Sequence, residues 1–116
     1  MITVYGIPNC DTVKKARAWL TAQGVEHQFH DFKKQGVPQA QLNTWLEHLG
    51  WEVVLNRKGT TWRQLDAAAQ SAVKDKASAM ALMLTQSSVI KRPVVAWASG
   101  LVTVGFDDQT WQEQLS

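Results

Sequence analysis

The segment "ITVYGIPNCDTVKKARAWLTAQGVEHQFHDF", residues 2–32, carries the two sequence periods that decide the fold. Residues 2–5 are a β-branched run bounded by glycine and proline, which is typical of a short strand. From Asp11 to the stop signal at Gly24, apolar residues recur at helical spacing, namely Val13, Ala16 and Leu20. A second strand-like run follows at 27–32. Strand, helix and strand in this order predict a parallel βαβ unit with a right-handed crossover.

The far end of the chain has a different pattern, with two strand-like runs in close succession. "PVVAW" (93–97) and "LVTVGF" (101–106) flank Ser99-Gly100, a pair suited to a tight turn, and therefore predict an antiparallel hairpin. Asp107 and Asp108 can cap a short closing helix. The C-terminal part is thus predicted to be a ββα unit.

The residues from about 37 to 90 are helical in pattern. Pro38 can begin a helix whose apolar stripe ends at Gly50 and comprises Leu42, Trp45, Leu46 and Leu49. Thr61 and Gln64 have the spacing of a capping box, which predicts a second helix. A third stripe is expected from Ala77, Met80, Ala81 and Leu84.

Taken together, these patterns predict one α/β domain over residues 1–116. Its expected architecture is a thioredoxin-like fold in which the βαβ and ββα units share a mixed four-stranded sheet. The helical stretch at about 37–90 is expected to be an insertion between these two halves.

Composition narrows the class of protein. A chain of 116 residues is the size of one ordinary domain, and a net charge of +2 is too small for a committed nucleic-acid binder. No apolar run approaches the roughly 18 residues of a membrane span, and the first residues do not resemble a signal peptide. We therefore expect a cytoplasmic protein with no membrane association, and nothing in the sequence demands more than a monomer.

Cys10 is the only cysteine, so the chain can form no internal disulfide. It lies where a strand is predicted to end and a helix to begin, and a helix N-terminus favours an anion such as a thiolate. A free cysteine has a pKa of about 8.5, which falls to roughly 3.5–7.5 in such settings. Lys14, one turn later, and Asn9, in the loop, are the predicted thiolate-stabilising residues. The alternative is an inert core cysteine, but a proline-containing loop is an unusual place for one.

No second cysteine is available to resolve an adduct on Cys10, because Val13 occupies the partner position of a CxxC motif. A dithiol mechanism is therefore excluded. A monothiol route remains, in which the thiolate attacks a disulfide or an oxidised substrate and an outside thiol resolves the adduct. Glutathione as co-substrate, or a glutaredoxin, is the expected partner, and a protein disulfide is a possible substrate.

Two basic stretches could supply an anion site near that sulfur. They are "NRKGTTWR" (56–63) and "IKRPVV" (90–95), and arginine is suited to bidentate binding of carboxylates and oxyanions. The candidate anion- or glutathione-binding residues in them are Asn56, Arg57, Lys91, Arg92 and Pro93. The three histidines have no ligand spacing with one another or with Cys10, so we expect no metal site and no bound cofactor.

Three segments together carry a family resemblance: "YGIPNCDTVKKA" (5–16), "LNRKGTTWR" (55–63) and "IKRPVVAW" (90–97). On these segments the chain resembles the arsenate reductase (ArsC)/Spx family, and within it the YffB-like branch. The resemblance implies a thioredoxin-like fold with a helical insertion. It also implies that Pro93 is cis and faces the nucleophilic cysteine.

The resemblance further implies roles for individual residues. Cys10 matches the catalytic cysteine of glutathione- and glutaredoxin-dependent arsenate reductases, and Arg92 matches an oxyanion-binding arginine. Asn56 or Arg57 falls in the region of a second such arginine, and the register leaves both open.

The sequence also departs from the arsenate reductases at three positions. Lys14 and Phe106 stand where arginines are expected, and Gly6 stands where a histidine is expected. Arsenate reduction is therefore expected to be absent or weak. The predicted function is a monothiol, glutathione-dependent thiol/disulfide reductase, with Lys91 and Arg92 available for a glutathione carboxylate. The alternatives are an Spx-like, non-enzymatic regulator that binds RNA polymerase, and a genuine glutaredoxin-dependent arsenate reductase.

Overall fold

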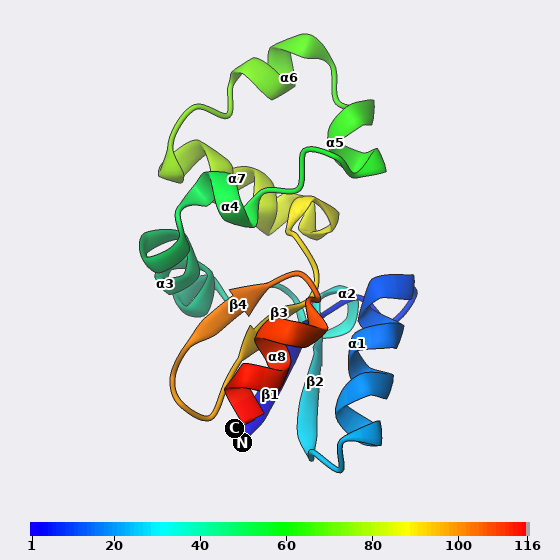
Figure 1. The fold of residues 1–116 in the computed structure, drawn as a ribbon. Helices are drawn as coiled ribbons and strands as arrows, with labels where there is room; N and C mark the ends of the chain where they lie inside the picture. Colours follow the sequence, from blue (N-terminus) through cyan, green and yellow to red (C-terminus); the bar gives the residue numbers. More distant parts are fainter. Residues whose placement is uncertain (116) are drawn as a thin grey trace. The chain divides into compact units, whose positions relative to one another are not determined.

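The computed structural model describes residues 1–115, which form two compact units. The sheet unit comprises Met1–Gln35 and the chain from Arg92 onward, and the helical unit comprises Gly36–Lys91. In Figure 1, the first and last parts of the chain form the sheet unit, and the middle part forms the helical unit.

The sheet unit contains a mixed four-stranded sheet with the strand order β2-β1-β3-β4. Its strands are β1 (Ile2–Gly6), β2 (His27–Asp31), β3 (Val94–Ala96) and β4 (Val102–Val104). β1 pairs in parallel with β2, and the pairings β1–β3 and β3–β4 are antiparallel. The βαβ and ββα units therefore share one sheet, which confirms the predicted thioredoxin-like α/β architecture.

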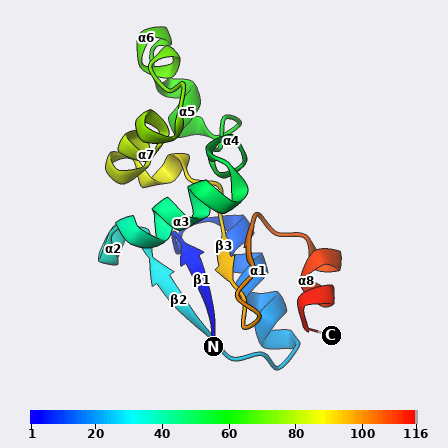
Figure 2. The same cartoon turned by 90° about the vertical axis from the view of Figure 1, so that its left-hand side faces the viewer.

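Two helices cover one face of this sheet. α1 (Asp11–Ala22) and α8 (Asp108–Leu115) lie on the same side of the strands, as Figure 2 shows. α2 (Phe32–Gln35) is a single turn that directly follows β2. The buried side chains beneath the two long helices form one cluster: Ile2, Val4, Ala16, Leu20, Val95, Trp97 and Trp111.

Trp111 of α8 lies at the centre of this cluster and is completely buried. Its ring contacts those of Trp97 and Phe106 edge-on, with centroids 5.1 Å and 4.7 Å away. Burying a large apolar side chain contributes about 1.5–3 kcal/mol, and edge-on aromatic pairs add about 0.5–1.5 kcal/mol. The same cluster contains Ala16 and Leu20 of α1 and Ile2 and Val4 of β1, so it also holds α1 against β1.

The helical unit consists of short helices and one 3₁₀ turn. They are α3 (Gln39–Leu49), α4 (Trp51–Val54), α5 (Thr60–Gln64), α6 (Ala67–Ser71), α7 (Lys76–Thr85) and the 3₁₀ turn η1 (Ser87–Val89). α3 follows the predicted pattern: it begins after Pro38, buries Leu42, Trp45 and Leu46, and ends at Gly50, whose φ of 90° is readily adopted only by glycine. None of the described helices is long and apolar enough to cross a membrane.

Two predictions for this unit are wrong. Thr61 and Gln64 form no capping box, because α5 begins at Thr60 after Gly59 and already ends at Gln64. The next helix has its own cap, Asp66, whose carboxylate accepts the Ala69 N–H at 2.7 Å. The five-residue α5 ends before the expected pattern can continue.

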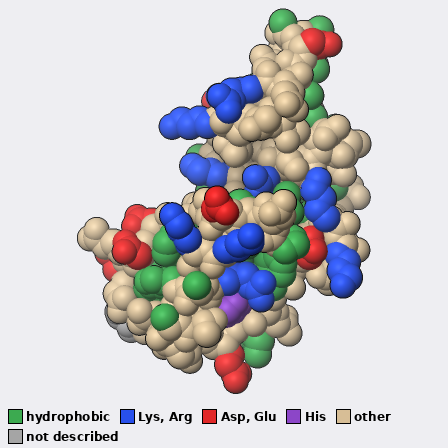
Figure 3. All heavy atoms as spheres, turned by 90° about the vertical axis from the view of Figure 1, so that its right-hand side faces the viewer, with side chains coloured by type: hydrophobic (Ala, Val, Ile, Leu, Met, Phe, Trp, Pro, Cys, Tyr) green, Lys and Arg blue, Asp and Glu red, His purple; other side chains and the backbone are tan. Residues whose placement is uncertain are grey.

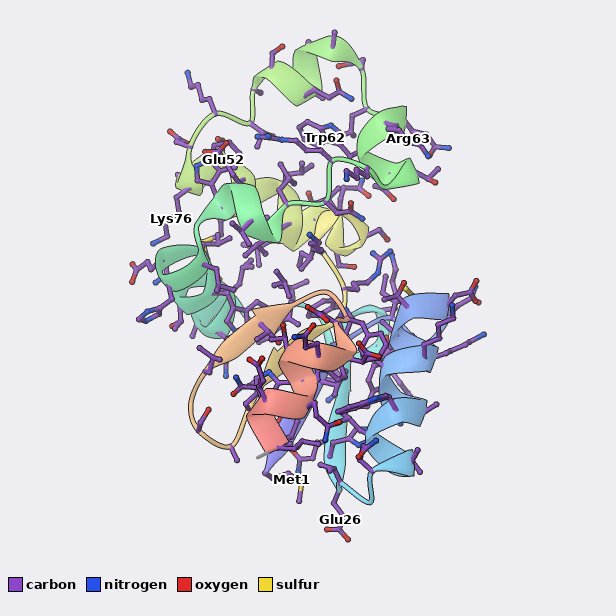
Figure 4. All side chains as sticks on the ribbon, in the orientation of Figure 1. Met1, Glu26, Glu52, Trp62, Arg63 and Lys76 are labelled. Atoms are coloured by element: carbon purple, nitrogen blue, oxygen red, sulfur yellow. The ribbon has the colours of Figure 1, made fainter. Side chains whose placement is uncertain are left out.

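The second error concerns the buried face of α7. Its fully buried residues are Ala79 and Met83, whereas Leu84 of the predicted stripe is 38% exposed. The sequence "KASAMALMLT" has apolar residues all round the helix, so several helical stripes are compatible with it. The Lys76 ammonium at the start of α7 (labelled in Figure 4) pairs with Glu47 of α3 at 2.8 Å. This ion pair is on the side of α7 that contacts α3.

Candidate functional site

Cys10 is the N-cap residue of α1. Its backbone is extended (φ −138°, ψ 122°), and its carbonyl oxygen accepts the Lys14 N–H at 2.9 Å, which is the first hydrogen bond of the helix. The strand β1 ends at Gly6, so a three-residue loop carries the chain from the sheet to this cap. The thiol is partly exposed. A nucleophile in this position is reachable from solvent while its backbone is fixed by the helix.

The surroundings of the sulfur lower its pKa. Burial alone would raise the pKa of Cys10, but this effect is outweighed. The Val13 N–H, the Arg92 guanidinium, by hydrogen bond and by charge, and the Thr12 N–H all favour the thiolate. The sulfur makes no fully formed capping hydrogen bond in this structure. The Thr12 and Val13 N–H groups therefore face the sulfur, which can accept full hydrogen bonds from them once it is ionised.

Arg92 reaches Cys10 because of the strand pairing. Pro93 is buried, follows Arg92 through a cis peptide bond as predicted, and is followed by β3. The first residue of β3, Val94, lies opposite Tyr5 near the end of β1. The start of β3 and the end of β1 are thus at the same edge of the sheet unit. Arg92 consequently contributes its side chain to the cysteine at the start of α1.

The two predicted thiolate-stabilising residues contribute less than expected. Lys14 and Asn9 are both exposed, and neither is among the groups that lower the Cys10 pKa. The positive charge that acts on the sulfur comes from Arg92. Lys14 belongs instead to the exposed basic side of α1, together with Lys15 and Arg17, and Figure 3 shows Lys and Arg side chains on the α1 side of the sheet unit.

The other predicted anion-binding residues lie in the helical unit. An antiparallel bridge between Leu55 and Ile90 brings their segments together. On either side of it, the Asn56 N–H donates to the Val89 carbonyl at 2.7 Å, and the Lys91 N–H donates to the Val54 carbonyl at 2.8 Å. Within the helical unit, residues 54–56 and 89–91 therefore lie side by side.

Asn56 and Arg57 also have local partners. The Asn56 side-chain oxygen accepts the Lys58 N–H at 3.2 Å and so forms the turn before α5. The Arg57 guanidinium lies over the Trp51 ring, 5.4 Å from its centroid, and 3.9 Å from a Glu52 carboxylate oxygen. In Figure 4, Arg63, the last basic residue of this segment, points away from the ribbon. Anion binding by Asn56, Arg57 and Lys91 stays a prediction.

Sequence reasoning missed the backbone groups of the site. The N–H groups of Thr12 and Val13 face the sulfur, and the N-cap rule, by which the N-cap side chain accepts from the second or third helical N–H, could have identified them. Within residues 1–115 there is no group of three or more histidine, cysteine, aspartate or glutamate side chains that could hold a metal ion. The His30 ring contacts the Tyr5 ring in a tilted arrangement, with ring centroids 5.1 Å apart.

Comparison with known proteins agrees with this architecture. The ArsC family model matches residues 5–114. The chain belongs to the ArsC family. The solved structure of a protein named YFFB has a TM-score of 0.93 and 45% identity over the whole of both chains. An arsenate reductase (ArsC) related protein from Brucella melitensis has a TM-score of 0.76 and 44% identity, covering 99% of this chain and 94% of its own. An uncharacterized protein of Haemophilus influenzae is 39% identical over 97% of this chain and 96% of its own length.

The chain is also similar to a transcriptional regulator. The global transcriptional regulator Spx of Streptococcus pyogenes is 24% identical over 98 residues, which are 82% of this chain and 71% of that protein. This ArsC-family member is thus related both to arsenate reductases and to Spx regulators.

Proposed function

We propose that this ArsC-family protein is a monothiol, glutathione-dependent thiol/disulfide reductase that uses Cys10 as its nucleophile and reduces disulfides. One observation carries the proposal: the cysteine is partly exposed and is surrounded by groups that lower its pKa, including the Arg92 guanidinium. Thiolates, not thiols, attack disulfides. An inert structural cysteine would need none of these groups.

The chemistry requires two exchanges of sulfur. Cys10 Sγ attacks one sulfur of the substrate disulfide, the substrate S–S bond breaks, and the other sulfur leaves as a thiolate. Since the chain has no second cysteine, a glutathione thiolate then attacks the mixed disulfide and restores the Cys10 thiolate. When the substrate sulfur on Cys10 is itself glutathione, the product is glutathione disulfide. The net reaction is then RSSG + GSH → RSH + GSSG, in which one free glutathione thiol is consumed and the glutathionyl sulfur of the substrate becomes the other half of the product.

Arg92 has two roles in this scheme. Its positive charge stabilises the Cys10 thiolate before attack and after resolution, and its hydrogen bond orients the sulfur. Arginine also binds carboxylates well, so the same side chain is the proposed contact for a glutathione carboxylate. Asn56, Arg57 and Lys91 are the further proposed anion-binding residues.

The direct test combines adduct formation with turnover. The purified protein is incubated with glutathione disulfide, and the mixed disulfide is mapped by mass spectrometry. Turnover of hydroxyethyl disulfide with glutathione is followed through glutathione reductase and NADPH. We expect an adduct on Cys10 and turnover that both disappear in Cys10→Ser. A wild-type protein that forms no adduct and turns over no disulfide would contradict the proposal.

Arsenate reduction is a weaker candidate, favoured by the resemblance to the Brucella melitensis protein. Phe106, where an arginine is expected from the family resemblance, packs edge-on against Trp111 in the core. A charged side chain there would have to leave the aromatic cluster. We therefore expect little or no arsenate turnover with glutathione and glutaredoxin, and robust turnover would favour this candidate.

A regulatory role is the third candidate, because of the relation to Spx. It predicts stable binding to RNA polymerase in a pull-down with purified components. Binding that is unaffected by Cys10→Ser, together with no disulfide turnover, would favour the regulator over the reductase.

A further inference from the structure

Gly6 and Val13 make an unusually close contact beneath the cysteine loop. Gly6 is the last residue of β1, and Val13 is the third residue of α1. A Cβ atom added at Gly6 would lie 2.9 Å from Val13 Cγ2 and 3.6 Å from Val13 Cγ1. The nearest atom of Phe29 would lie 3.8 Å away, at ordinary contact distance. The space for a side chain at Gly6 is therefore occupied by Val13.

Neither partner of this contact can move aside easily. The β1 strand is paired on both sides, with Gly6 opposite Asp31 of β2 and Tyr5 opposite Val94 of β3. Val13 is completely buried, and a valine in a helix has one strongly preferred rotamer. A side chain at Gly6 would thus displace the first turn of α1 from the sheet by a few tenths of an ångström.

That first turn holds the backbone of the candidate site. Cys10 is its N-cap, and the Val13 N–H is one of the groups that act on the sulfur. We propose that Gly6 is a positioning residue: its missing side chain lets Val13 lie against β1, which aims the Val13 N–H at Cys10 Sγ. The inference rests on the proposed function, because it assigns the glycine to the reactivity of the same thiol.

The test is the pH profile of Cys10 alkylation by iodoacetamide in wild type and in Gly6→Ala. Gly6 does not have a positive φ, so alanine introduces no backbone strain there and the variant reports on the side-chain contact. We expect the titration midpoint to move to higher pH, and the alkylation rate at pH 7 to fall roughly three- to tenfold as the thiolate fraction decreases.

Two further variants separate positioning from a general loss of stability. Val13→Ala removes the clashing methyl groups but keeps the N–H, so the double variant Gly6→Ala/Val13→Ala should recover a midpoint close to that of wild type. Gly24→Ala, at the other end of α1, introduces strain at a φ of 71°, and it should lower the melting temperature without moving the midpoint.

The outcomes distinguish this inference from the proposed function. If wild-type Cys10 titrates like an ordinary thiol, the proposed function fails, and this inference fails with it. If wild type titrates low and folded Gly6→Ala titrates equally low, only the positioning role of Gly6 is overturned. A shift in Gly6→Ala that the double variant does not reverse would also overturn it, since the shift would then not pass through Val13.

Discussion

The first turns of α1 and α7 are closed by two different kinds of cap. At α7, Asp75 and Ser78 form a complete capping box: the Asp75 carboxylate accepts the Ser78 N–H at 2.9 Å, and Ser78 Oγ accepts the Asp75 N–H at 3.1 Å. At α1, the cap is Cys10, with no fully formed side-chain hydrogen bond. The cap of α7 is a carboxylate that is already charged at neutral pH. At α1 the corresponding backbone N–H groups face a sulfur, which must lose its proton before it can act as an anionic cap.

The pKa shifts of the two caps have the same direction and different meanings. Hydrogen bonds from the Ser78 hydroxyl and N–H lower the pKa of Asp75, so that cap is charged throughout the neutral range. The pKa of Cys10 is lowered although burial opposes it. For both groups the folded pKa lies below the unfolded value, so each anion adds stability that is lost as the pH falls through the folded pKa. For Cys10 that window lies between its lowered pKa and the ordinary thiol value.

The largest effect is expected from Arg92, whose guanidinium acts on the cap sulfur of α1 by hydrogen bond and by charge. Arg92→Ala should slow adduct formation with glutathione disulfide by roughly ten- to a hundredfold, because a charge-assisted contact is worth about 1.5–3 kcal/mol. It should also raise the Cys10 pKa. Lys14→Ala is the matched control. It removes a positive charge on α1 one turn after Cys10, and it should leave the Cys10 pKa close to that of wild type. The special role of Arg92 would be refuted if the two variants changed the alkylation rate equally and also changed equally the rate of adduct formation, followed by mass spectrometry.

The cap of α7 should respond in stability alone. Asp75→Ala removes the acceptor of the capping box and should lower the melting temperature by roughly 3–8 °C, as is typical of a lost N-cap in a chain of this size. Asp75→Asn, which retains an acceptor, should recover most of the loss. Circular dichroism melts measure both variants, and the Cys10 alkylation rate should be unchanged in each. A changed rate would mean that the two caps are coupled.

A smaller effect should follow when the α1 cap is made to resemble that of α7. At pH 7, Cys10→Asp should melt roughly 2–5 °C above Cys10→Ala, because its carboxylate can accept the free N–H groups and lies beside Arg92. The difference should disappear at acidic pH, where the carboxyl group is protonated. Melting curves of the two variants across pH would show this. An Asp variant no more stable than the Ala variant at pH 7 would indicate that the first turn cannot accommodate an anion.

Much of the sheet unit could be predicted from the sequence, because its periods are unambiguous. Short β-branched runs bounded by turns predict β1, β3 and β4, and an alternating run at 27–32 predicts β2. Val13, Ala16 and Leu20 are all fully buried, as the helical spacing of α1 predicts. The helical unit was harder. In α7 the apolar residues surround the helix, so the face that packs depends on neighbouring helices, and α5 ends at Gln64 for reasons beyond local capping patterns.

The candidate site divides in a similar way. Cys10 and Arg92 could be identified from residue type and position. The action of Arg92 on the sulfur depends on the pairing of β3 with β1, which the sequence suggests only through the fold. The Val13 N–H and the space above Gly6 could not be read from side-chain chemistry, because a backbone direction and a 2.9 Å approach are properties of packing.

The pKa of Cys10 tests the central claim most directly. The rate of iodoacetamide alkylation of the native protein should be measured from acidic to alkaline pH, with the unfolded chain in denaturant as the reference for an ordinary thiol. We predict a native midpoint clearly below that of the unfolded chain, because Val13, Arg92 and Thr12 together outweigh the effect of burial on the Cys10 pKa. A native midpoint at or above the unfolded one would contradict it, and Cys10 would then be a structural N-cap without a nucleophilic role.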